Sequence, residues 1–453
     1  MFNFIETIKR VIRQMFRKND IKRAIGAEPA ITDEMLQKIS QWLEMYRGKA
    51  EWITDYVRSL RIEQGICREF ADVVLSELDI NVTNEKLDGI LKKHISALNE
   101  NMQSGLALGS FCLKPLGDDK AEFVTADKFI PLNFDDGGNL TGVVFVSTKK
   151  IKSDSFYRRF ELHELTSAGL HISNFAYHSA SADDMGRPCD LAEVDEWADL
   201  IPDVTYPSDR MDLGYYRNPI KNEIDDTFCG VSIYDSAIDL IKKADIQFGR
   251  LEWEFESGER VINVDITALQ EAPVFGNDGE KRYKMPKLNK RLYRGLNLDG
   301  GNGDFYKEFS PEFRDSNIIN GLEQIKRAIE FNVGLAYGDL SDVQSVEKTA
   351  TEIKHAKQRK YARVNAIEKN LQKCLEDFTF GVAFYNGLTK SGYEFNCKWN
   401  DSILTDEDTE RKQDIQDISI GVLPLWQYRM KWYGEDEKTA KAIIAGMQSE
   451  VIE

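Results

Sequence analysis

The chain has 453 residues, of which 42% are hydrophobic and 30% are charged, so it is long enough and apolar enough to fold into two or three domains. Its formal net charge of −17 argues against a sequence-reading DNA-binding protein, because such domains are usually basic. The six cysteines are scattered and form no CxxC pair, which indicates neither a zinc ribbon nor a disulfide framework.

The first 32 residues are predicted to form an N-terminal arm. Residues 1–16 have the pattern of an amphipathic helix with one apolar and one basic side. Such a helix suits a membrane surface or an acidic partner, and the interpretation that we favour is a docked first helix or a mobile arm. The stretch has no h-region and no small-residue cleavage site, so we expect no signal peptide. No apolar run reaches the roughly 18 residues of a membrane span, so we expect no membrane partner.

Residues 33–229 are predicted to form a mixed α and β body. Helical periodicity comes first and predicts helices over 32–46, 68–79 and 86–105. The period then changes to two, and the stretch FIPLNFDDGGNLTGVVFV predicts a β-hairpin over 129–147 with its turn at DDGGN. Two more strands and a loop-rich stretch are predicted at 156–165, 170–178 and 181–228.

Two long helices separated by an insert follow the body. The first is predicted to begin near Ser232, within 230–258, and about 25 residues give about 37 Å of helix. The insert, 259–317, contains an alternating stretch from Val261 to Leu269 that predicts a strand. The second helix is predicted over 318–336, with a buried stripe of Ile319, Leu322, Ile325, Ile329 and Val333. Four charged residues fall off that stripe and are expected on a wet side: Glu323, Lys326, Arg327 and Glu330.

A short loop and a much longer helix come next. Residues 337–348 are too rich in Gly, Asp and Ser to hold a helix, and Gly334 and Gly338 allow flexing at the entry of this loop. The helix predicted over 349–385 opens with a capping-box spacing, Thr349 to Glu352. Its apolar stripe consists of Val364, Ile367, Leu371, Cys374 and Phe378.

The rest of the chain completes an α+β fold. Residues 386–412 contain a predicted strand that is expected to return to the earlier sheet, and 413–453 read as two or three short helices. The two long helices joined at one end by a small insert make a stalk. Because a stalk buries little surface by itself, we expect neighbouring chains to pack against it in a ring or bundle.

Several short motifs contain residue types found in catalytic or metal sites, but none has the required pattern. HELTSAGLH, from His163 to His171, lacks the second histidine of a zinc helix, because that position is Ser167. Asp135 and Asp136 are explained by a hairpin turn. The glycines of LDGGNGD lack the lysine of a phosphate-binding loop, and the five histidines assemble no catalytic triad. We therefore expect no metal, no cofactor and no enzymatic activity.

Three blocks of the chain resemble the portal proteins of tailed bacteriophages, in particular the family common in long-tailed phages of Gram-positive bacteria. The first block is FCGVSIYDSAIDLIKKAD, which resembles the entry to a first stem helix. The second, from NIINGLEQIKRAIEFNVG to VNAIEKNLQ, is similar to a second stem helix, tunnel loop and long helix. The third runs from WNDSILTDEDTERK to EKTAKAII and resembles the last strand of a portal wing and a crown.

The resemblance implies an α+β portal-type protomer with a mixed α/β wing, a two-helix stem, a small α/β clip, a long wing-crossing helix and a helical crown. Its expected segments are an arm (1–32), the first part of the wing (33–229), the first stem helix (230–258), the clip (259–317), the second stem helix (318–336), the tunnel loop (337–348), the long wing helix (349–385), the returning wing strand (386–412) and the crown (413–453).

It also implies a role in the virion. About twelve copies would form a ring at one capsid vertex, assembled in the host cytoplasm, and double-stranded DNA would enter and leave through its channel. The implied partners are the large terminase subunit, the major capsid protein, the scaffolding protein and a head–tail adaptor.

The tunnel loop and the second stem helix carry the candidate DNA contacts. On the helix, Lys326 and Arg327 would form rings of positive charge if their side faces the channel, or would simply pair with Glu323 and Glu330; both can hold together. In the loop, the candidates are Tyr337, Gly338, Asp339, Asp342, Glu347 and Lys348. The three acids would keep contact with DNA weak and Lys348 could touch the backbone, unless the loop is only a solvated connection.

Two further sets are expected at subunit interfaces. The basic block on the long helix consists of Lys354, Lys357, Arg359, Lys360 and Arg363. We favour pairing of this block with an acidic neighbouring subunit over DNA binding. The strand residues Val261, Val264 and Ile266 are expected to extend a sheet across subunits.

Two other classes of protein remain open from the sequence. One is a different oligomeric structural protein of a virion, such as an adaptor. The other is a metal-dependent nucleic-acid enzyme using Asp135 and Asp136, which the absence of a metal or nucleotide motif disfavours.

Overall fold

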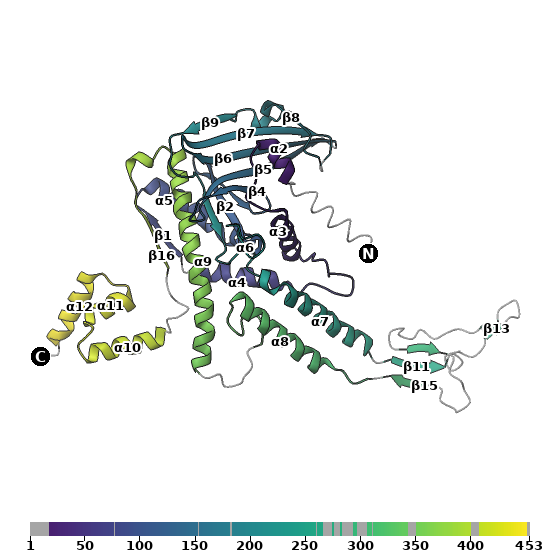
Figure 1. Ribbon diagram of the computed structural model, residues 1–453. Coiled ribbons are helices and arrows are strands. Elements are labelled where there is room, and N and C mark those ends of the chain that lie inside the picture. The colour runs from purple at the N-terminus through teal and green to yellow at the C-terminus, as the bar shows by residue number, and fades with distance from the viewer. Residues whose placement is uncertain are drawn as a thin grey trace.

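The protein is a mixed α+β molecule with an elongated projection (Figure 1). The computed structural model describes residues 18–76, 78–152, 154–181, 184–259, 261–265, 274–275, 281–282, 293–296, 306–309, 311–342, 350–399 and 407–450. The basic helix predicted in residues 1–16 lies outside this range. In the described part of the chain, no helix has both the length and the apolar character needed to cross a membrane.

Helices form one side of the body, and they are α2 (Lys18–Ile25), α3 (Asp33–Tyr46), α4 (Ile62–Ser76), α5 (Glu85–Ser96) and α6 (Leu98–Leu108). Helix α3 begins where the Thr32 hydroxyl accepts a hydrogen bond from the Met35 N–H at 3.2 Å. The single helix predicted over 86–105 is instead two, because the Ala97 N–H closes α5 with a bond to the His94 carbonyl at 3.3 Å.

The largest sheet confirms the predicted hairpin and the two strands after it. Its order is β4-β5-β6-β7-β8, with β9 also pairing with β7, and all these pairs are antiparallel. The strands are β4 (Phe129–Phe134), β5 (Leu140–Lys152), β6 (Ser155–Thr166), β7 (Gly169–Ser179), β8 (Arg187–Cys189) and β9 (Asp203–Tyr206). Two 3₁₀ turns, η1 (Leu191–Glu193) and η2 (Asp195–Trp197), lie between β8 and β9.

A second sheet lies in the main core of the body. It has the order β10-β2-β3, with β2 (Ser110–Gly117), β3 (Lys120–Thr125) and β10 (Gly214–Arg217). Phe111 and Tyr216 stack across it with ring centroids 4.6 Å apart. The same core holds apolar residues of α3, α4, α6 and the long helix α9 (Ala350–Tyr385), so a single hydrophobic cluster joins the helical side to this sheet.

Helix α9 crosses the body and confirms the predicted stripe. It has 36 residues, or about 54 Å at 1.5 Å per residue. Its five predicted stripe residues, Val364 to Phe378, are all buried. The helix approaches β10 so closely that a Cβ on Gly214 would lie 2.1 Å from the Cys374 carbonyl oxygen.

The projection consists of two antiparallel helices that lie side by side (Figure 1): α7 (Ile238–Ser257) and α8 (Asp315–Val333). Helix α7 begins six residues later than predicted, after the 3₁₀ turn η3 (Asp235–Ala237). The reason is that the preceding segment is bound to α3: Asp235 accepts a hydrogen bond from the Trp42 indole at 2.8 Å, and the Tyr234 hydroxyl donates to the Trp42 carbonyl at 2.8 Å.

Short strands lie at the far end of the projection, and they are β11 (Val261–Asp265), β12 (Val274–Phe275), β13 (Lys281–Arg282), β14 (Tyr293–Leu296) and β15 (Tyr306–Phe309). Strand β11, which confirms the strand predicted to start at Val261, is central in the order β14-β11-β15, and β12 pairs with β13. Val261 and Val264 belong to β11, whereas Ile266 lies outside the described residues.

The predicted return of the chain to the earlier sheet is wrong. Strand β16 (Phe395–Trp399), which follows the 3₁₀ turn η5 (Thr389–Ser391), pairs instead with β1 (Leu78–Val82), whose first two residues belong to the helix predicted over 68–79. The two strands form a separate two-stranded antiparallel sheet beside α5 and α9. The last three helices, α10 (Glu407–Ser419), α11 (Leu425–Tyr433) and α12 (Glu437–Glu450), form a separate small group (Figure 1).

Candidate functional site

The turn after helix α8, residues 334–342, is held by one buried carboxylate. Helix α8 ends at Gly334, whose φ of +90° suits glycine, and the chain folds back along the helix. Glu330 has no exposed surface. Its Oε1 accepts the backbone N–H groups of Gly338 at 3.1 Å, Leu340 at 2.6 Å and Ser341 at 2.8 Å. Its Oε2 accepts the Ser341 hydroxyl at 2.9 Å.

A second carboxylate on α8 binds the end of the same turn. Glu323 accepts the N–H of Asp342 at 2.7 Å and the ammonium of Lys326 at 2.7 Å. Burial raises the pKa of Glu323, but the bonds from Lys326 and Asp342 outweigh it, so the pKa lies below its usual value. The two carboxylates are seven residues apart, so they fasten the turn at two levels about 10 Å apart along the helix.

The expectation of a wet, charged side on α8 is therefore wrong for Glu323 and Glu330. Both are buried because the turn covers that side of the helix and supplies the donors that a buried carboxylate needs. The exposed side chains of α8 are mostly uncharged: Ser316, Asn317, Ile319, Asn320, Gln324, Phe331 and Asn332.

The turn also contacts helices α9 and α4 through one lysine. The Lys360 ammonium lies 3.1 Å from Asp339 of the turn and 2.6 Å from Glu69 of α4. Burial lowers the pKa of Lys360, but the two carboxylates raise it more, so the pKa lies above its usual value. Asp339 in addition accepts the Ala336 N–H at 3.0 Å. One buried cation thus joins three elements.

Two arginines of α9 complete this site. The Arg359 guanidinium lies over the ring of Tyr337, 4.8 Å from its centroid, and over Phe331 at 5.0 Å, and it donates to the Leu335 carbonyl. Arg363 donates to the Pro219 carbonyl at 3.2 Å. Both arginines therefore have partners within their own chain.

The structure brings together two sets of residues that the sequence assigned to separate roles. Of the candidate DNA contacts, Tyr337 meets Arg359 and Asp339 meets Lys360 of the basic block. Lys326, Gly338 and Asp342 are bound instead by the two carboxylates of α8. The pairing of Lys326 with Glu323 is confirmed, and Arg327 lies half-buried on α8.

Several predicted site residues cannot be placed in this way. Glu347, Lys348 and the expected cap Thr349 lie outside the described residues, as do the side chains of Lys354 and Lys357 in α9. The interface role of the basic block and of β11 stays a prediction.

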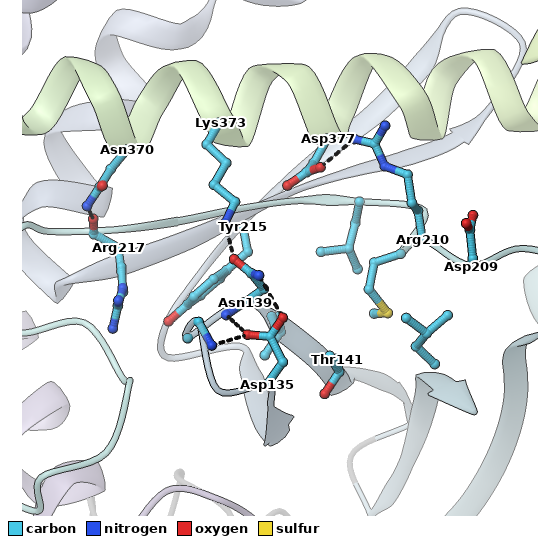
Figure 2. Close-up of a pocket in the computed structure, with 16 residues that line it drawn as sticks. Asp135, Asn139, Thr141, Asp209, Arg210, Tyr215, Arg217, Asn370, Lys373 and Asp377 are labelled. Atoms are coloured by element: carbon cyan, nitrogen blue, oxygen red, sulfur yellow. Dashed lines mark hydrogen bonds and ion pairs between the residues drawn. The ribbon is translucent and has the colours of Figure 1, made fainter. Parts of the chain in front are cut away.

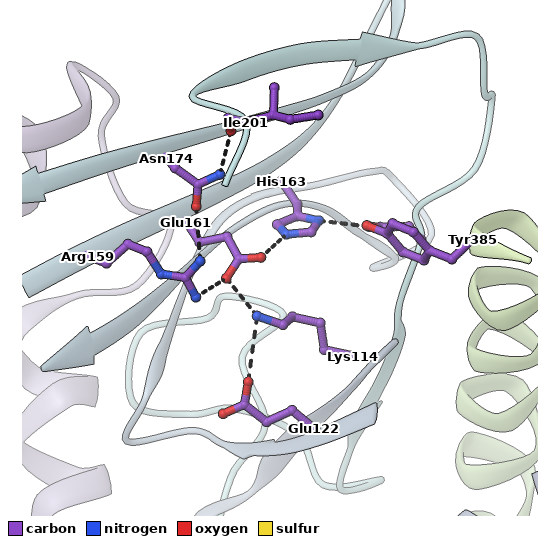
Figure 3. Close-up of polar contacts among 9 residues, drawn as sticks. Lys114, Glu122, Arg159, Glu161, His163, Asn174, Ile201 and Tyr385 are labelled. Atoms are coloured by element: carbon purple, nitrogen blue, oxygen red, sulfur yellow. Dashed lines mark hydrogen bonds and ion pairs between the residues drawn. The ribbon is translucent and has the colours of Figure 1, made fainter. Parts of the chain in front are cut away.

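A second polar cluster lies buried in the body, and sequence reasoning missed it (Figure 3). In this His163 cluster, Glu161 lies 2.7 Å from Lys114, 2.9 Å from Arg159 and 3.1 Å from His163. The other side of the His163 ring contacts Asp212 at 2.9 Å. Burial lowers the pKa of His163, but the two carboxylates raise it to about 9, so the imidazole is charged.

The His163 cluster joins elements rather than binding a substrate. Its members come from β2, β6 and the segment before β10, and the Tyr385 hydroxyl of α9 donates to Asp212 at 2.5 Å. His163 and Asp212 are 2% and 1% exposed, so a solute cannot reach them. The signal for this cluster in the sequence is weak, because its residues are spread from 114 to 385.

A cavity of about 360 Å³ lies between α9 and the β4–β5 turn (Figure 2). Arg210 pairs with Asp377 at 2.8 Å, and Lys373 donates to Asn139. Asp135 accepts the N–H groups of Gly137 and Asn139 at 2.9 and 2.8 Å, which confirms its role in the turn. Within the described ranges no group of three or more His, Cys, Asp or Glu residues could hold a metal ion.

Comparison of the chain with protein-family models gives no match, and comparison with curated proteins gives none either.

Proposed function

We propose that this chain is a portal protein of a tailed bacteriophage: a passive ring of about twelve subunits through which double-stranded DNA passes. The observation that carries the proposal is the projection formed by α7 and α8 (Figure 1). The chain leaves the body along α7, forms short strands at the far end and returns along α8; turn 334–342 and the 36-residue helix α9 follow in the sequence. This is the order of elements that a portal stem, clip and wing helix require.

The surface of the projection supports assembly with other copies. Trp253 of α7 and Phe331 of α8 are 59% and 57% exposed, and Phe309 and Phe313 at the far end are also exposed. Within the described residues these large apolar side chains along the helix pair stay largely exposed, so neighbouring projections are suitable partners.

In this proposal the ring does not grip DNA. The net charge of −17 per subunit repels the phosphate backbone, and the uncharged exposed side of α8 adds no cations. The ring would sit at a capsid vertex in the virion. The packaging terminase and, later, a head–tail adaptor would dock at the far end of the projection, while the capsid and scaffolding proteins would contact the body.

The decisive test is the oligomeric state of the purified full-length protein. Native mass spectrometry should give a species near twelve times 51.9 kDa, or about 620 kDa, and negative-stain images should show a ring with a central hole. A ring one subunit larger supports the proposal equally. A monomer or dimer at every salt concentration would refute it, and a closed shell without a channel would favour another virion structural protein.

A further inference from the structure

We infer that Glu330 is a positioning residue that fastens turn 334–342 to helix α8, so that the helix and the turn move as one unit. The sequence of this turn, with two glycines and several short polar residues, favours flexibility. The contacts oppose it, because three backbone N–H groups and one hydroxyl converge on a single carboxylate.

The fastening is all-or-none. Glu330 has no exposed surface, and a buried carboxyl group is unfavourable without hydrogen-bond partners. If the turn moved away, Glu330 would lose four donors at once, and Gly338, Leu340 and Ser341 would lose their acceptor. Breaking only some of these hydrogen bonds leaves buried polar groups without partners. Two discrete states are therefore expected: a fastened turn and a fully detached one.

The fastened turn also connects the projection to the body. Asp339 of the turn shares the Lys360 ammonium with Glu69 of α4. Leu340 packs against α4, where a Cβ on Gly65 would lie 3.7 Å from a methyl group of Leu340. A displacement of α8 is therefore transmitted through the turn to α9 and α4.

For the proposed portal, this means that the entry to the tunnel loop follows the stem helix rather than moving independently; this consequence rests on the proposed function. The contacts themselves do not, because they lie within one chain. Hydrogen–deuterium exchange can be measured in any oligomeric state, so it distinguishes a failure of the portal proposal from a failure of the fastening.

Hydrogen–deuterium exchange of the full-length Glu330→Gln protein tests the inference. The glutamine can still place one oxygen against the three backbone N–H groups, but that oxygen carries no negative charge, and its NH2 group replaces the oxygen that accepts the Ser341 hydroxyl, so the turn should detach more readily. We expect exchange at residues 338–341 to accelerate by at least about tenfold, because bonds to a charged acceptor are lost. Exchange in α4 around Gly65 and Glu69 should also rise, since the connection through Lys360 is weakened.

Glu254→Gln is the matched control. Glu254 is also a largely buried carboxylate of the projection, and Arg314 binds it at 2.7 Å. It lies at the C-terminal end of α7, which is the end of the helix pair away from turn 334–342. The Glu254→Gln variant should therefore leave hydrogen exchange at residues 338–341 unchanged. Equal exchange in wild-type, Glu330→Gln and Glu254→Gln proteins would overturn the inference, and a response confined to the turn would overturn the link to α4.

A milder variant covers the case in which Glu330→Gln does not fold. Ser341→Ala removes only the donor to Oε2, so the three backbone bonds remain. Exchange at 338–341 should then rise by about twofold or more, as expected for one lost hydrogen bond. No change in Ser341→Ala would refute the fastening.

Discussion

Replacing Glu63 with glutamine should remove a pH-dependent loss of stability where the helical side of the body meets α7. Glu63 lies in the first turn of α4 and is 1% exposed. Within the described chain, neither of its carboxylate oxygens has a hydrogen-bond partner. The nearby Asp245 of α7 already accepts the Trp52 indole and the Leu60 N–H, both at 2.8 Å. Burial raises the pKa of Glu63 to about 7, and the charge of Asp245 adds to this effect while Arg61 opposes it.

The expected magnitude follows from the two pKa values. A carboxyl whose pKa is 4.5 when unfolded and about 7 when folded binds its proton more tightly in the folded state. The contribution of Glu63 to stability is therefore largest below pH 4.5, and it falls as the pH rises through 7. The loss amounts to about 3 kcal/mol, since one pKa unit corresponds to about 1.4 kcal/mol. Above pH 7 this contribution no longer changes.

Urea denaturation at pH 5 and pH 8 measures the effect. The wild-type protein should lose up to about 3 kcal/mol of unfolding free energy through Glu63 between these values, and Glu63→Gln should lose that much less. Glu85→Gln is the control, because Glu85 occupies the first turn of α5 but is exposed. If Glu63→Gln and wild type show the same difference between pH 5 and pH 8, the buried carboxyl is not the cause.

Two other predictions concern the core. The charged form of His163 contributes stability that is fully present below pH 6.5 and is lost as the pH rises through about 9. Between pH 6.5 and 9.5 the wild-type protein should therefore lose about 3 kcal/mol of unfolding free energy through His163, and His163→Gln should abolish this loss. An unchanged loss in denaturation experiments on His163→Gln would contradict this prediction. Gly381→Ala would place a Cβ 2.1 Å from the Asp212 carbonyl oxygen and should cost about 1–3 kcal/mol or more, whereas Gly89→Ala in α5 meets nothing within 4 Å and should stabilise by about 0.5–1 kcal/mol. Thermal unfolding of both variants measures these changes in stability. Equal effects of Gly381→Ala and Gly89→Ala would contradict the close approach of α9 to the segment around Asp212.

Periodicity along the chain predicts those elements whose apolar face is buried locally. The α9 stripe from Val364 to Phe378 and the hairpin around Asp135 were found in this way, because both signals lie within one short stretch. The pair α7 and α8 also follows from spacing. The beginning of α7 was misplaced, since contacts of Tyr234 and Asp235 with Trp42 are not visible in a local pattern, and α8 spans Asp315–Val333 rather than the predicted 318–336.

Features that depend on distant partners could not be predicted. Strand β1 pairs with β16 more than 300 residues later, and each strand has only five residues. The burial of Glu330 was missed for a different reason: its donors are mostly backbone N–H groups, which every residue carries and no motif records. Helical periodicity can place a glutamate opposite an apolar stripe, but it does not show that a later turn covers it.

The far end of the helix pair α7 and α8 is closed by a clamp, and this has a consequence for how such a molecule can change. Glu254 and Arg314 are joined by two side-chain hydrogen bonds, and the rings of Phe255 and Phe313 lie 5.5 Å apart, so the chain departs and returns through adjacent points. The entropy of closing a loop between adjacent points depends only weakly on its length. The segment beyond this clamp can therefore be shortened, lengthened or exchanged with little expected effect on the body, so its length and sequence can change independently of the rest of the chain.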